Sequence, residues 1–238
     1  MTSETLALDH PSVLAAVLFG SHARGDADGS SDTDVAVFAD AYSAEELRKV
    51  RAELEKEGSN SQTVISLYST GTTEFMAQQG SLFLWHLKLE GRILTDKDGW
   101  LAKLLSHLPP YDGSNAARDL ETFAGVLGDC RNAMWTQADT LDFEMATVFS
   151  VLRNVGIIYC FRTGTPCFGR TAPINRLASG LGCSFPFFPD QIAAMERMRL
   201  RYVRDPASES ANISSTVARG WIDTAISLLE FVRGRLND

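Results

Sequence analysis

The 238-residue chain is long enough to bury a substantial core in one large or two small domains. Hydrophobic residues make up 45% of it and charged residues 22%, which is typical of globular proteins and argues against intrinsic disorder. The formal net charge of −8 argues against a protein that coats nucleic acid with clustered Lys and Arg, so long nucleic acid is not an expected partner.

The N-terminal residues 1–12 are acidic and lack a basic segment followed by an apolar one, so they do not resemble a secretory signal. No apolar run approaches the roughly 20 residues of a membrane span. The cysteines are scattered and form no metal-binding spacing with the histidines, which is typical of reduced thiols (Cys130, Cys160, Cys167 and Cys183). We therefore expect a cytoplasmic protein with no membrane partner.

Up to about residue 98, short apolar runs alternate with helical patterns, which predicts a small mixed α/β domain. The apolar runs predict strands over residues 13–20, 33–40, 62–69 and 91–96. A helix is predicted over 42–58, where Ser43 and Glu46 have the spacing of a capping box, and another over 72–90.

Two prolines, a glycine and polar turn residues between residues 106 and 117 predict a linker. Beyond it only helical patterns occur, over residues 115–138, 140–163, 189–204 and 211–236. One apolar stripe is typical of a bundle core (Met145, Val148, Phe149, Leu152, Val155 and Tyr159). The predicted fold class is α+β, with a small mixed-sheet domain over residues 1–108 and an all-α helical bundle over 114–238.

The candidate chemistry is concentrated in residues 18–38, LFGSHARGDADGSSDTDVAVF. The first apolar strand ends at Gly20 and Ser21, where a glycine lets the backbone approach a ligand closely. A helix that begins there directs its free N–H groups and the positive end of its dipole at a phosphate. Ser21 adds a hydroxyl, and Arg24 either pairs with a phosphate oxygen or is solvated.

Asp32 and Asp34 are spaced so that both carboxylates project from one face of the next strand, with Val35 and Val37 on the opposite, buried face. Two adjacent carboxylates repel each other unless a cation lies between them. Hard oxygen ligands that share an ion with a polyphosphate fit Mg²⁺. The pattern therefore predicts a metal and triphosphate site suited to in-line attack on the α-phosphorus.

This stretch resembles the signature of the DNA polymerase beta-like nucleotidyltransferase superfamily, usually written GS-x-A-R-G followed by S-D-x-D, in the form typical of its minimal and antibiotic-modifying branches. The resemblance extends loosely to about residue 96, where HLKLEGRILTD is similar to the helix-Glu-Gly-strand ending common in the family. It implies ATP or another NTP as donor, with Gly20 and Ser21 at the triphosphate. Asp32 and Asp34 are the implied catalytic Mg²⁺ ligands. Further candidate nucleotide-binding residues in the motif are Arg24 and Ser31.

Members of this superfamily commonly carry a third carboxylate on the next core strand, as metal ligand or as base for the acceptor hydroxyl. Here Val64 and Ser66 occupy the plausible positions. A serine does not accept a proton at neutral pH as a carboxylate does, so the base comes from elsewhere or catalysis is weak or absent. The candidate replacements are Glu74, Asp96, Glu121 and Glu144.

Glu144 is the candidate catalytic residue that we favour among these, because antibiotic-modifying relatives can draw a base from the helical domain. The pattern LDFEMAT fits equally well a helix start with a solvated acid, which the helix dipole favours. The helical half also resembles the HEPN type of partner domain. HEPN ribonucleases need an arginine that is followed a few residues later by a histidine for proton transfer. Here Arg153 is followed by Tyr159 and by no histidine, so RNase activity is not expected.

Two functional hypotheses remain open. The first is Mg²⁺-dependent transfer of a nucleoside monophosphate from an NTP to a hydroxyl of a small molecule, such as an aminoglycoside, or of a protein. The second is a catalytically degenerate protein that binds a nucleotide or a partner protein without turnover, as in toxin and antitoxin systems. The missing strand acid favours the second, and the retained Asp32 and Asp34 favour the first. A homodimer or a protein partner is compatible with both.

Overall fold

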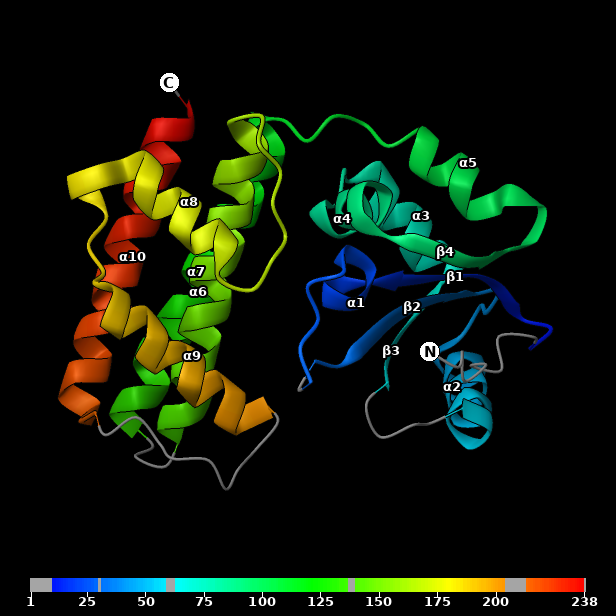
Figure 1. Cartoon of the computed structure of the whole chain (residues 1–238), viewed down its shortest axis with the longest axis horizontal. Helices are drawn as coiled ribbons and strands as arrows, with labels where there is room; N and C mark the ends of the chain where they lie inside the picture. Colours follow the sequence, from blue (N-terminus) through cyan, green and yellow to red (C-terminus); the bar gives the residue numbers. More distant parts are fainter. Residues whose placement is uncertain (1–9, 30, 59–62, 137–139, 204–212, 238) are drawn as a thin grey trace. The chain divides into compact units, whose positions relative to one another are not determined.

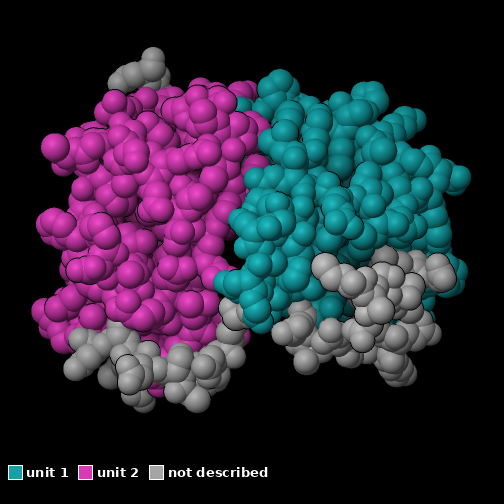
Figure 2. Space-filling model, viewed as in Figure 1, with its two compact units in different colours: residues 1–111 teal, residues 112–238 magenta. Residues whose placement is uncertain are grey.

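The computed structural model describes residues 10–29, 31–58, 63–136, 140–203 and 213–237. The chain forms two compact units, residues 1–111 and 112–238, shown in different colours in Figure 2. The division lies inside the segment predicted to be a linker. Each unit is built around buried apolar residues of its own.

The N-terminal unit is built on a four-stranded mixed sheet with the strand order β3-β2-β1-β4 (Figure 1). The strands are β1 (Val13–Phe19), β2 (Thr33–Ala39), β3 (Thr63–Ser69) and β4 (Arg92–Asp96). β1 pairs antiparallel with both β2 and β4, whereas β2 and β3 are parallel. A parallel pair needs a crossover connection, which α2 (Ala44–Gly58) supplies.

The capping box predicted for α2 is present in a slightly shifted form. The backbone N–H of Glu46 donates to Ser43 Oγ at 3.1 Å, as the spacing predicts. The Glu46 carboxylate accepts from the N–H of Tyr42 at 2.7 Å, one residue before the Ser43 amide that the motif names.

The two faces of the sheet have separate cores. Val35 and Val37 of β2 pack with Val50 of α2 on one face. Ala36 and Phe38 pack on the other face with leucines of α4 (Leu82–Glu90) and α5 (Trp100–Ser106). Figure 1 shows α2 on one side of the sheet and α3, α4 and α5 on the other. The predicted burial of the two valines opposite the aspartates is therefore confirmed.

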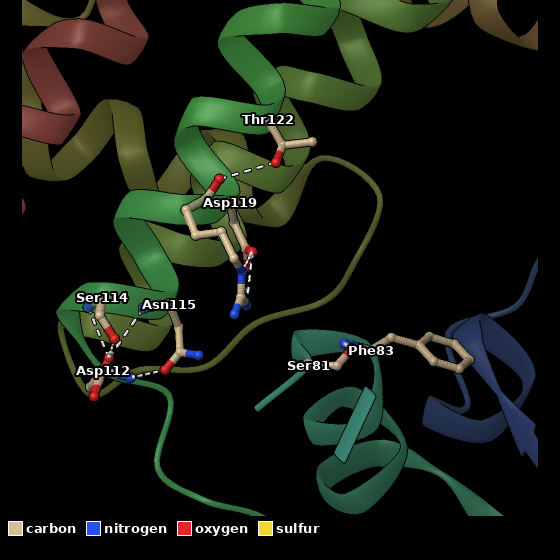
Figure 3. Close-up of polar contacts among 8 residues, drawn as sticks. Ser81, Phe83, Asp112, Ser114, Asn115, Asp119 and Thr122 are labelled. Atoms are coloured by element: carbon tan, nitrogen blue, oxygen red, sulfur yellow. Dashed lines mark hydrogen bonds and ion pairs between the residues drawn. The ribbon is translucent and has the colours of Figure 1, made fainter. Parts of the chain in front are cut away.

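The single helix predicted over residues 72–90 is wrong, because the structure has two helices there, α3 (Thr70–Gln78) and α4. Gly80 lies between them with φ of 62°, in the left-handed region that commonly ends a helix. Ser81 then starts α4 by accepting a hydrogen bond from the N–H of Phe83 at 3.2 Å (Figure 3). A short 3₁₀ turn, Lys97–Gly99, precedes α5, a helix that the sequence pattern did not predict.

Every element described in the C-terminal unit is helical. The helices are α6 (Gly113–Thr136), α7 (Leu141–Arg162), α8 (Ala172–Leu181), α9 (Pro189–Val203) and α10 (Ser215–Asn237), with a 3₁₀ turn at Gly182–Ser184. Asp112 starts α6 earlier than predicted, since its carboxylate accepts from the N–H groups of Ser114 at 2.8 Å and Asn115 at 3.1 Å (Figure 3). The pattern did not predict α8, although a proline in its first turn favours a helix start there.

α7 is the central helix of this unit and packs against α6, α8, α9 and α10. Its predicted apolar stripe forms core, with Met145 and Phe149 fully buried. By length and composition alone α7 could cross a membrane, which the sequence analysis did not anticipate. Because 67% of its most apolar window is buried against neighbouring helices, its apolar character matches that of a bundle core.

Candidate active site

The candidate site begins where β1 ends in a sharp bend. The bend opens α1 (Gly20–Arg24), a single helical turn. Gly20 has φ of 73°, and a Cβ atom on it would lie 2.5 Å from Asp34 Oδ2. A side chain there would be strained by the positive φ and would displace the Asp34 carboxylate, so glycine is strongly favoured at this position. Because Phe19 pairs with Asp34 across the two strands, the bend lies directly against this carboxylate.

α1 ends after one turn at Gly25, which has φ of 82°. The N–H groups of Gly25 and Asp26 both donate to the carbonyl oxygen of Ser21, at 2.9 Å and 3.1 Å. No side chain caps the N-terminal end of α1, because the preceding residue is Phe19. The first-turn amides are therefore of the kind that can donate to a phosphate oxygen.

Ser31 is buried, and its hydroxyl closes the loop between α1 and β2. Its Oγ donates to Asp28 Oδ1 at 2.9 Å and accepts from the N–H of Asp28 at 3.0 Å. The Nε2 atom of His22 lies 3.3 Å from the Ser31 carbonyl oxygen, which links α1 to the same loop. In this structure Ser31 thus shapes the loop. His22 occupies the variable position x of the GS-x-A-R-G motif, so the motif itself assigns it no role.

The guanidinium group of Arg24 is held by two carboxylates. Its Nη1 donates to Glu90 Oε2 at 3.1 Å, and its Nε donates to Asp26 Oδ2 at 3.2 Å. Only 19% of the Arg24 side chain and 20% of the Glu90 side chain are exposed. Burial acts to lower the pKa of Arg24, but the hydrogen bonds to Asp26 and Glu90 outweigh it and raise that pKa. A phosphate contact by Arg24 would have to compete with these two partners.

The two aspartates of the motif lie at the start of β2 and are partly exposed. Asp34 faces the bend, and Asp32 precedes the first residue of the strand. Within the described ranges, no group of three or more His, Cys, Asp or Glu side chains is arranged to hold a metal ion. Two carboxylates completed by phosphate oxygens would match the hard oxygen ligands that Mg²⁺ prefers.

The strand beside Asp34 offers an apolar side chain where the superfamily commonly has an acid. In the parallel register Asp34 pairs with Val64, and Ala36 pairs with Ser66. Val64 is 47% exposed, so its side chain is accessible at the candidate site. Ser66 lies one step further from the bend, beside Ala36 rather than beside the carboxylate.

Two of the four candidate replacement acids lie at the other end of the sheet. Asp96 pairs with Ala15, near the start of β1, whereas Asp34 pairs with Phe19 at its end. The Asp96 carboxylate caps α5, accepting from two backbone N–H groups at 2.9 Å each. Glu74 lines a cavity at the carboxyl ends of β2 and β3, again away from the bend.

The other two replacement acids lie in the helical unit. Glu121 of α6 accepts a hydrogen bond from Arg233 of α10. Glu144 of α7 is only 3% exposed, so the solvated alternative is wrong. It contacts the thiol of Cys130, and burial, helped by this hydrogen bond, raises the pKa of that thiol to about 12. The sequence could show the favourable first-turn position of Glu144, but its burial depends on packing against α6.

The match to a family model covers the unit that contains this site. Residues 4–98 match the family described as Polymerase beta, Nucleotidyltransferase. The whole chain is similar to a crystal structure of spectinomycin adenyltransferase AAD(9) from Enterococcus faecialis with ATP and spectinomycin. The TM-score is 0.53 at 11% sequence identity, covering 92% of this chain and 93% of that chain, which establishes a shared fold. No curated protein matches this chain.

Replacing Gly20 with alanine tests the contact between the bend and Asp34. Gly20→Ala is expected to lower the free energy of unfolding by about 1 to 3 kcal/mol, because it adds a steric overlap to an unfavourable φ. Chemical denaturation measures the change. Gly25→Ala is the matched control, since Gly25 also has a left-handed φ, of 82°, but has no atom within 4 Å of the added Cβ. Equal effects of the two substitutions would contradict the close approach.

Proposed function

Because residues 4–98 match the Polymerase beta, Nucleotidyltransferase family, we propose that this protein transfers a nucleoside monophosphate from ATP or another NTP to a hydroxyl group of a small molecule. One observation carries the proposal: the close approach of Gly20 to Asp34, which places uncapped backbone amides beside a carboxylate. Binding of a metal triphosphate needs both the amides and the carboxylate.

In the proposed reaction the first-turn amides and the Ser21 hydroxyl bind the triphosphate. Asp32 and Asp34 hold Mg²⁺, which offsets charge on the phosphates when it is bound there. The acceptor oxygen attacks the α-phosphorus, the bond to the β-phosphate oxygen breaks, and pyrophosphate leaves. The acceptor hydroxyl loses its proton to a base or to water. Val64 stands beside Asp34 where the superfamily commonly has an acid, so β3 supplies no base. The proton therefore passes to water or to a base from the helical unit.

The helical unit has a feature that favours a small acceptor over a protein. A cavity of about 390 Å³ lies between α8 and α9, within the size range of small-molecule sites. Phe185 and Phe187, which precede α9, line it together with Asn175 and Glu196. Aromatic walls with one carboxylate suit a cationic, hydroxylated molecule, a class that includes aminoglycosides.

A second candidate function is nucleotide or partner binding without turnover. The specific observation that favours it is Val64, an accessible apolar side chain next to Asp34. In this reading the bend and the aspartates bind Mg²⁺ and a nucleotide, but nothing on β3 completes the catalytic set. The two functions share a binding site and differ only in turnover.

Neutralising the aspartates tests the enzyme hypothesis. Asp32→Asn and Asp34→Asn are each expected to reduce pyrophosphate release by at least about a hundredfold, because each removes a charged metal ligand. The assay uses Mg²⁺, each labelled NTP and a panel of acceptors that includes spectinomycin, aminoglycosides and cell lysate. Asp40→Asn, an exposed acid just beyond the far end of β2, is the control. Unchanged turnover in both motif variants would refute the assignment.

Restoring an acid at position 64 separates the two candidate functions. Val64→Asp is expected to raise pyrophosphate release about tenfold or more, since it places a carboxylate beside Asp34 in the strand register. Val64→Asn has a similar size without the charge and is expected to show no gain. If Val64→Asp binds ATP as the natural protein does and still shows no release with any acceptor, the non-catalytic function is favoured.

The proposed acceptor cavity is tested through Glu196. For a cationic acceptor, Glu196→Gln is expected to raise the acceptor KM about fivefold or more while the KM for ATP stays within twofold, because Glu196 lines the proposed acceptor cavity and is not part of the nucleotide site. Steady-state kinetics with both substrates measure the two constants. A parallel rise in both, or no change in either, would contradict an acceptor site between α8 and α9.

A further inference from the structure

Glu90 occupies a position that helix stability does not explain. It is the last residue of α4, where a negative charge opposes the negative end of the helix dipole. Its carboxylate is largely buried, so solvent does not offset this disadvantage. An interaction elsewhere must therefore compensate, and Arg24, which lies 66 residues earlier in the chain, makes one.

The last turn of α4 contacts the bend on both sides of Gly20. On one side Glu90 accepts from Arg24, the final residue of α1, at 3.1 Å. On the other side the ring of His86 packs edge-to-face on Phe19, with the ring centroids 5.6 Å apart. The buried His86 also places its Nε2 atom 3.2 Å from Glu90 Oε2. The last turn of α4 thus contacts the residue before Gly20 through an aromatic pair and the last residue of α1 through an ion pair.

This end of α4 is itself fixed to the sheet. A Cβ atom on Gly91 would lie 2.4 Å from the Leu87 carbonyl oxygen and 2.7 Å from Val17 Cγ1 of β1. The chain therefore passes as close to β1 as a glycine allows, directly after Glu90. Leu84 and Leu87 of the same helix are buried in the core. Glu90 therefore lies at a helix end that is packed against β1 and the core.

α1, by contrast, cannot hold its own position. A single turn of helix is intrinsically unstable, because its ordering costs more free energy than its few hydrogen bonds return. No side chain caps its first turn. Contacts from outside the turn must therefore determine where its amides point, and the last turn of α4 supplies one charged and one aromatic contact of this kind.

We propose that Glu90 is a positioning residue of the nucleotide site, which holds Arg24 and thereby keeps the amides of Gly20 and Ser21 beside Asp34. The inference rests on the proposed function. It assigns Arg24 an indirect role, in place of the direct phosphate contact that the motif suggests. Burial acts to raise the pKa of Glu90, but the contacts with His86 and Arg24 outweigh it and lower that pKa, which keeps the carboxylate charged at neutral pH.

A double-mutant cycle tests this role with two readouts. The variants are Glu90→Gln, Arg24→Gln, their combination, and the conservative Arg24→Lys. Hydrogen exchange of residues 20–26 without nucleotide reports whether α1 is held. Isothermal titration with ATP and Mg²⁺ reports whether the site binds. Glu45→Gln is the matched control, because Glu45 also has an arginine partner at 3.2 Å but lies exposed on α2.

Glu90→Gln is expected to speed exchange of the α1 amides about fivefold or more and to weaken ATP binding by a similar factor, with the thermal midpoint little changed. The combined variant should bind ATP no more weakly than Arg24→Gln alone, because both residues act through one contact. Arg24→Lys should recover part of the affinity, since it keeps the charge that faces Glu90. Glu45→Gln should leave both readouts within twofold.

Three results would overturn the inference. Unchanged exchange in Glu90→Gln would show that Glu90 does not hold α1. Faster exchange with unchanged ATP affinity would show that the contact does not serve the nucleotide site. Losses that multiply in the combined variant would show that Glu90 does not act through Arg24. If the natural protein binds no ATP, the proposed function fails, while exchange still decides whether Glu90 holds the turn.

Discussion

Gly20 lies so close to Asp34 that a Cβ atom added to it would be 2.5 Å from the carboxylate oxygen Oδ2. This close approach connects the candidate site to the fold. The antiparallel register brings the end of β1 to the start of β2, so the bend and the carboxylate must share one small space. Glycine permits both the left-handed φ and the close approach. As a result, backbone donors and an acidic side chain lie side by side, which is the arrangement that a metal-bound phosphate requires.

The parts of this account that the sequence predicted are those that depend on local patterns. Alternation of apolar residues predicts the two faces of β2, and comparison with the family motif shows that β3 lacks an acid at Val64 and Ser66. Only the strand register identifies Val64 as the residue beside Asp34. The contact between Arg24 and Glu90 could not be predicted in this way, since the residues are 66 positions apart. The burial of Glu144 was missed for the same reason, because local charge preference and packing against another helix are independent.

The candidate site combines a bend held by several contacts with a β3 strand that lacks the usual acid. Contacts from α4 and from the loop closed by Ser31 hold α1, which supports the bend that we propose binds phosphate. The acid that commonly completes the superfamily site is replaced by Val64, and the replacement acids in the N-terminal unit lie at the far end of the sheet. The proposed nucleotide binding therefore has more structural support than the proposed proton transfer, and the proposal fits an acceptor hydroxyl that needs little activation best.

The most direct test of the central claim is to locate a bound metal nucleotide by NMR, with Mn²⁺ added at low ratio to ¹⁵N-labelled protein and Mg²⁺-ATP. Paramagnetic broadening falls off steeply with distance, so it maps the residues around the ion. The account predicts that the amide signals of Gly20, Ser21 and Asp34 broaden first. Broadening centred instead on the cavity beside Asp40 and Glu74, with the bend signals unaffected, would contradict it.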